Sequence, residues 1–212
     1  MKRDFNEIQR FVEREIVHRY DDFDAGHGRD HVKTVISQAL QLAEHYPEVD
    51  RCMLLIAAAY HDLGLINGRE RHHIDSARFI HEDERLRQWF TEEEINIIAD
   101  AAEDHRASSD HEPRTIYGRI VAEADRIIDS ETIVRRALQY GMKHSPELDR
   151  EGQYERLLDH MREKYDYGGY LRLWIPFSEN AKRLEEFRKT LSDPTAFRQL
   201  FDRIYDQINH HQ

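Results

Sequence analysis

The strongest constraint on the fold is the run from Cys52 to Tyr60, the most apolar stretch in the chain, which ends in the adjacent polar pair His61 and Asp62. A run of this kind predicts a central buried helix, and it is far too short to cross a bilayer. Gly64 follows and lets the backbone turn away. The sequence therefore predicts a buried helix with an imidazole and a carboxylate at its inner end.

The chemistry of this pair favours a metal ion. Imidazole nitrogen and carboxylate oxygen are ligands that divalent cations such as Mn, Fe, Co, Ni and Zn accept together. Neighbouring positions inside a helix point about 100° apart, whereas a pair at the frayed last turn can converge on one ion. The structural alternatives are a hydrogen-bonded core histidine at His61 and a turn cap at Asp62.

Two further residues complete a ligand set. His31 lies where the loop at Gly28 enters an amphipathic helix, and Asp125 lies in a segment that is otherwise apolar on one side. Taken singly, His31 could be a surface histidine, and Asp125 could pair with a neighbouring arginine. The order histidine, His-Asp, distant aspartate resembles the HD-domain superfamily of metal-dependent phosphohydrolases, and the resemblance covers roughly residues 27–130.

This resemblance implies an all-α fold and a site for a divalent metal (Mn, Fe, Co, Ni, Zn or Mg) held by His31, His61, Asp62 and Asp125. Such an ion polarises a phosphoryl oxygen and lowers the pKa of water towards neutrality. The implied function is hydrolysis of a nucleotide or another small phosphate ester or anhydride. The resemblance does not distinguish among three activities: phosphomonoesterase, phosphodiesterase and nucleotide pyrophosphohydrolase.

Some members of the superfamily hold a second ion with two more histidines. His72 or His73, in the segment before Ser76 and Ala77, resembles the first of these, and His105 resembles the second. Two readings stay open: a second metal ion, or a single ion with these histidines in contact with the substrate phosphate. In either reading the expected catalytic residues are Asp62, His72, His73 and His105.

Basic side chains near these motifs are the expected substrate contacts. Arginine forks match phosphate oxygens in pairs, and lysine supplies a point charge. Each such side chain could equally form a solvated ion pair in a chain this acidic. The predicted substrate-binding residues are Arg106, Lys33, Arg126 and His27, with Arg29 as a further candidate.

The bulk properties set outer limits. The chain has 212 residues and a formal net charge of −11, which argues against sequence-independent binding of nucleic acid. Helical spacing of apolar residues recurs along the chain, and no domain linker is evident. We expect a single all-α domain over residues 1–212, with the metal-site core at about 27–130 and the helices of 131–212 completing it.

Partners, location and rival functions follow from the same features. We expect a cytoplasmic protein with a small phosphorylated substrate, most simply a nucleotide, and with no membrane or nucleic-acid partner. The C-terminal helices have three open roles: the contact surface of a homodimer, a cover over the pocket, or core packing. The rival functions are a non-hydrolytic sensor that binds metal and nucleotide, and a di-iron oxygenase of the HD type.

Overall fold

The computed structural model describes residues 3–24, 26–109 and 111–210, and throughout these residues the regular secondary structure is helical, without a strand. The predicted all-α class is confirmed. The contacts divide the chain into two compact units, Met1–Arg126 and Ile127–Gln212. The single domain expected over residues 1–212 stays a prediction beside this division. The boundary falls in a short extended stretch without glycine or proline, so no change in composition marks it.

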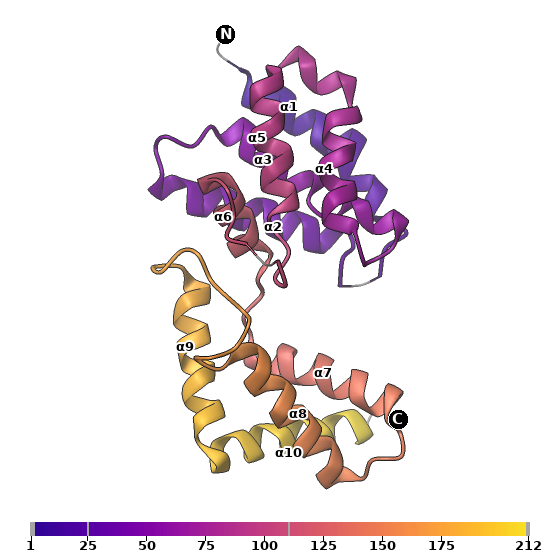
Figure 1. Cartoon of the computed structure of the whole chain (residues 1–212). Coiled ribbons are helices and arrows are strands. Elements are labelled where there is room, and N and C mark those ends of the chain that lie inside the picture. Colours follow the sequence, from indigo (N-terminus) through magenta and orange to yellow (C-terminus); the bar gives the residue numbers. More distant parts are fainter. Residues whose placement is uncertain (1–2, 25, 110, 211–212) are drawn as a thin grey trace. The chain divides into compact units, whose positions relative to one another are not determined.

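The apolar run forms α3 (Arg51–Tyr60) at the centre of the first unit (Figure 1). Asp50 caps its start by accepting hydrogen bonds from the backbone N–H groups of Cys52 and Met53, at 2.7 and 3.3 Å. Every residue from Cys52 to Tyr60 is buried, because α1, α2, α4, α5 and α6 all pack against this helix. The prediction of a central buried helix is confirmed.

In the described part of this unit, five other α-helices surround α3. They are α1 (Phe5–Phe11), α2 (Arg29–Leu42), α4 (His72–Glu82), α5 (Glu92–Glu103) and α6 (Ile116–Asp125). The sequence Thr91-Glu92-Glu93-Glu94 predicts a capping box, and Thr91 and Glu94 form it at the start of α5. A 3-10 turn over Leu63–Asn67 joins the end of α3 to α4. Helices α2, α4, α5 and α6 therefore begin or end near one point.

The second unit is built from α7 (Ser130–His144), α8 (Arg150–Tyr165), α9 (Glu179–Ser192) and α10 (Pro194–His210). Helices α7 and α9 each pack against both α8 and α10. Asp129 and Ser178 cap α7 and α9, as their sequence positions predict.

One helix end in the second unit differs from the sequence pattern. The pattern predicts that the helix through Ile133 stops at Gly141, whereas α7 continues to His144. The guanidinium of Arg156 lies over Gly141: a Cβ there would stand 2.0 Å from Nη2 of Arg156, which donates to the carbonyl of Ala137 at 2.7 Å and would have to shift. Among the described residues, no helix is both long and apolar enough to span a membrane.

Candidate metal centre

The end of α3 delivers His61 and Asp62 into the interior of the first unit. Both side chains are buried, and Asp62 leaves the helical conformation with φ −108° and ψ 2°. The buried hydroxyl of Tyr20 donates a hydrogen bond to the carbonyl of Ala59 at 2.8 Å, which ties down the last turn. The change of backbone direction at Asp62 lets two adjacent side chains converge, as predicted.

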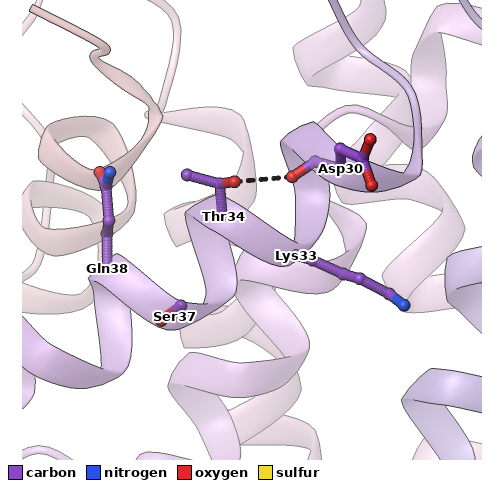
Figure 2. A pocket seen from close by; sticks show the side chains of 5 residues that line it. All are labelled: Asp30, Lys33, Thr34, Ser37 and Gln38. Atoms are coloured by element: carbon purple, nitrogen blue, oxygen red, sulfur yellow. Dashed lines mark hydrogen bonds between the residues drawn. The ribbon is translucent and has the colours of Figure 1, made fainter.

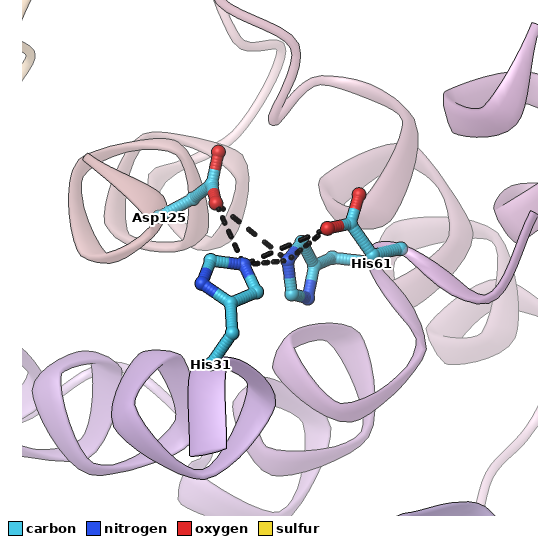
Figure 3. A group of neighbouring side chains, drawn as sticks. His31, His61 and Asp125 are labelled. Atoms are coloured by element: carbon cyan, nitrogen blue, oxygen red, sulfur yellow. Dashed lines mark hydrogen bonds and ion pairs between the residues drawn. The ribbon is translucent and has the colours of Figure 1, made fainter. Parts of the chain in front are cut away.

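His31 and Asp125 complete the first group of ligand atoms. His31 lies in the first turn of α2, and Asp125 is the last residue of α6. Nε2 of His31 lies 3.3 Å from Nε2 of His61, 3.5 Å from Oδ2 of Asp62 and 3.2 Å from Oδ1 of Asp125. Figure 3 shows His31, His61 and Asp125 pointing toward one another from three elements. The structure thus brings together the four residues that the sequence predicts as metal ligands.

The other oxygen of Asp62 faces a second group. Oδ1 of Asp62 lies 3.5 Å from Nε2 of His72 and 3.4 Å from Nε2 of His105, and these two nitrogens are 3.1 Å apart. His72 opens α4, and His105 follows α5. His72, rather than His73, therefore occupies the position next to Asp62. The two groups share one carboxylate, with one oxygen facing each.

Hydrogen bonds behind the histidines set the direction of their lone pairs. Nδ1 of His61 lies 2.8 Å from the carbonyl of Ala58, and Nδ1 of His72 lies 2.8 Å from the carbonyl of Arg69. Nδ1 of His105 makes the same contact with the carbonyl of Ala102. A carbonyl only accepts, so each Nδ1 carries the proton. In a neutral ring, Nε2 then presents its lone pair to the site.

This arrangement fits a divalent cation. Ligand atoms at about 2.0–2.2 Å from a common ion lie about 3–3.5 Å from one another, close to the separations of 3.1–3.7 Å found here. Nε2 of His72 and Nε2 of His105 face each other, and in each neutral ring the proton is on Nδ1. Two lone pairs therefore point at each other and repel. A cation between them would turn that repulsion into attraction.

The electrostatics of the two groups differ. Burial lowers the pKa of His61, but Asp62 and Asp125 outweigh burial and raise the pKa to about 10. For the pKa of Asp62, burial acts upward, yet His61 and the other histidines hold it well below its usual range. Burial and the neighbouring His105 lower the pKa of His72 to about 4. The His72 ring is therefore neutral at pH 7, the form that binds a metal.

Arg126 donates hydrogen bonds to one residue of each ligand group. Its Nη1 donates to Oδ2 of Asp125, and its Nη2 donates to the carbonyl of His105, each at 2.8 Å. The side chain is buried. The sequence predicts Arg126 as a substrate contact, and in the structure its Nη1 and Nη2 are engaged by Asp125 and His105. A ligand carboxylate held in this way is the usual arrangement behind protein-bound metals.

The remaining predicted contacts separate into two sets. His27, His73 and Arg106 lie at the rim of the site: the ring of His27 lies 5.8 Å from that of His31, and the ring of His73 lies 5.5 Å from that of His72. Arg106 donates to the carbonyl of Glu70 at 2.5 Å, and its Nη1 lies 3.4 Å from Nδ1 of His73.

Lys33 is not brought to the ligand groups. Two residues along a helix correspond to about 200° of rotation, so Lys33 projects from a different face of α2 than His31. Its amino group lies 3.9 Å from a carboxylate oxygen of Glu13. Lys33 lines a shallow, open depression with Asp30, Thr34, Ser37 and Gln38 (Figure 2). Arg29 is also exposed and pairs with Asp21.

One rim residue was missed by the sequence reasoning. Arg69 is exposed, and its Nη2 lies 2.9 Å from Nε2 of His27. Its backbone carbonyl is the acceptor for Nδ1 of His72. Its place in the loop before His72 is the signal that could have identified it.

The comparisons with known proteins agree with this geometry. The segment over residues 28–128, which contains all of the ligand groups, matches the family model described as HD domain. Searches of curated proteins and of solved structures gave no significant match to the chain. The match over residues 28–128, together with the paired His/Asp groups that lie in this segment, supports membership of the HD-domain superfamily, whose members are mostly metal-dependent hydrolases.

Proposed function

We propose that this protein is a metal-dependent phosphohydrolase that acts on a nucleotide or another small phosphate ester or anhydride. The observation that carries the proposal is the shared carboxylate of Asp62, which faces His31 and His61 with one oxygen and His72 and His105 with the other. Asp62 would therefore contribute a ligand to each of the two groups, and a pair of divalent ions, if bound, would supply the chemistry for displacement at phosphorus.

The geometry supports two ligand sets. His31, His61, Asp62 and Asp125 would hold one divalent ion, and Asp62, His72 and His105 would hold a second. Of the two readings left open by the sequence, the orientation of the His72 and His105 lone pairs favours the second ion. When bound, ions at these positions polarise a phosphoryl oxygen and supply hydroxide at neutral pH.

Other residues orient the ligand histidines and contact the substrate phosphate. The hydrogen bonds to Ala58, Arg69 and Ala102 fix the histidine rings before substrate arrives. With His72 and His105 assigned as ligands, the predicted contacts left at the rim to bind phosphate are His27, His73 and Arg106. Arg106 supplies a guanidinium that stabilises the negative charge developing on phosphoryl oxygens.

A substrate screen on the metal-loaded full chain tests the proposal. We expect phosphate or pyrophosphate release from at least one nucleotide or phosphoester in Mn²⁺, Co²⁺ or Ni²⁺, abolished by a chelator and restored by the ion. Asp62→Asn should lose this activity. Tight nucleotide binding without release of phosphate would contradict hydrolysis and identify a sensor, and substrate oxidation in an iron-loaded protein would identify an oxygenase.

A further inference from the structure

Arg69 and Arg106 occupy equivalent positions relative to the two ligand groups. Arg69 contacts His27, whose ring packs against His31 of the first group. Arg106 contacts His73, whose ring packs against His72 of the second group. Each ligand group thus has its own guanidinium, placed one histidine away from it.

The partners of Arg69 are weak for an arginine. Nη2 of Arg69 lies 2.9 Å from Nε2 and 3.2 Å from Nδ1 of His27, so it contacts the imidazole ring rather than one lone pair, and Nδ1 of His27 lies 2.9 Å from a carboxylate oxygen of Asp24. Within the described part of the chain, no carboxylate oxygen lies within 4.0 Å of the Arg69 guanidinium, although the hydrogen bond with His27 and, to a lesser extent, the charge of Arg69 lower the pKa of the nearby Asp24. A phosphate oxygen pair is a stronger, charge-assisted partner than an imidazole ring. The exposed guanidinium can therefore turn from His27 to an anionic ligand.

The loop that carries Arg69 suits this exchange. Gly68 has φ +101°, and an added Cβ would meet no atom within 4 Å, so the backbone reverses in open space just before Arg69. The backbone carbonyl of Arg69 stays fixed by Nδ1 of His72 while the side chain is exposed. Side-chain movement therefore need not disturb the ligand histidine.

We propose that Arg69 is a substrate-binding residue that, together with Arg106, selects ligands with two adjacent phosphoryl groups, because the two guanidinium groups flank different ligand groups of one site. This inference rests on the proposed function and makes it more specific. Arg106 takes the phosphoryl group beside His72 and His73, and Arg69 takes the next one beside His27 and His31. The substrate class is a phosphoanhydride, such as a nucleoside di- or triphosphate, rather than a phosphomonoester.

Binding of non-hydrolysable probes tests the inference without turnover. Calorimetry on the Mn²⁺-loaded full chain would compare methylenediphosphonate, which has two phosphoryl groups, with methylphosphonate, which has one. The wild type should bind the diphosphonate more tightly. In Arg69→Ala, affinity for the diphosphonate should fall about tenfold or more, the value of a charge-assisted hydrogen bond, with little change for methylphosphonate and in bound manganese.

Two further variants separate recognition from general effects. Arg69→Lys should restore part of the affinity, since lysine keeps the charge but lacks the fork. Arg14→Ala removes one exposed positive charge elsewhere in the same unit and should bind both probes as the wild type does. Equal affinity of the wild type for both probes, unchanged diphosphonate affinity in Arg69→Ala, or equal loss of both probes would overturn the inference. Dependence on Arg69 in a protein that hydrolyses no phosphate would refute the proposed function and support the anion site.

Discussion

Gly64 lies so close to the backbone of His72 that a Cβ built on it would stand 1.9 Å from the His72 carbonyl oxygen. The same glycine donates its N–H to Oγ of the buried Ser76 at 2.9 Å. The turn after Asp62 is therefore pressed against the first turn of α4. This contact fixes His72 next to Asp62, and it depends on the absence of a side chain at position 64.

Replacement of Gly64 by alanine is expected to displace α4 from the site. Because the obstructing atoms are backbone, the cost should be about 1–3 kcal/mol of unfolding free energy, as for other overpacked positions. Thermal or denaturant unfolding measures this cost, and metal analysis should show loss from the His72 group. Gly168→Ala is the matched control, since no atom lies within 4 Å of a Cβ there. Equal stability of the two variants would contradict the role of close packing at Gly64.

Metal stoichiometry should depend on which ligand is removed. The wild type is expected to hold about two equivalents of a divalent ion, and Asp62→Asn should lose both, because its carboxylate serves both groups. Asp125→Asn and His105→Ala should each weaken one ion, since each belongs to one group. Mass spectrometry of the metal content after dialysis makes the comparison. Asp62→Asn with the wild-type metal content would refute the bridging geometry.

Arg126 should influence metal affinity without touching the ion. Arg126→Lys cannot hold both Asp125 and the carbonyl of His105, so the dissociation constant for Mn²⁺ should rise about 10–100-fold, the usual effect of losing a group that orients a ligand. Arg106→Ala should leave that constant near the wild-type value, because Arg106 contacts His73 and Glu70 rather than a ligand. Titration calorimetry with Mn²⁺ measures both. The opposite ranking of the two variants would reverse the roles assigned here.

The stability of the ion-free protein should pass through a maximum near neutral pH. The pKa of His61 is raised from 6.5 to about 10, so its stabilising contribution is complete below about pH 6.5 and is lost as pH rises through 10. The pKa of His72 is lowered from 6.5 to about 4, so the unfolded chain binds the extra proton and stability falls between those values as pH decreases.

Melting temperatures of chelator-treated protein across pH 4–10 test whether stability falls towards both acid and alkaline pH. Added Mn²⁺ should weaken the decline above pH 7, because the ion stabilises deprotonated His61 in place of the proton. An ion-free melting temperature that keeps rising from pH 7 to pH 10 would contradict the assignment of His61.

The sequence alone determined the parts of this protein that depend on local pattern. The apolar run of α3 predicted a central helix, because a stretch without polar residues must be buried on every side. Thr91, Glu94, Asp129 and Ser178 predicted helix starts, since their side chains bond to backbone N–H groups a few residues away. The order of His31, His61, Asp62 and Asp125 predicted a ligand set through resemblance to the HD-domain superfamily.

Only the tertiary structure decided which side chains face the ligand groups and which do not. The choice of His72 over His73 depends on the packing of α4 against Gly64, which lies in another element. The hydrogen bonding of Arg126 and the place of Arg69 at the rim depend on contacts with residues distant in sequence. Lys33 shows the converse, since a residue two positions from a ligand projects from another face of the same helix. Local bonding fixes where helices begin and end, but side-chain roles at this centre are fixed by which helices pack together.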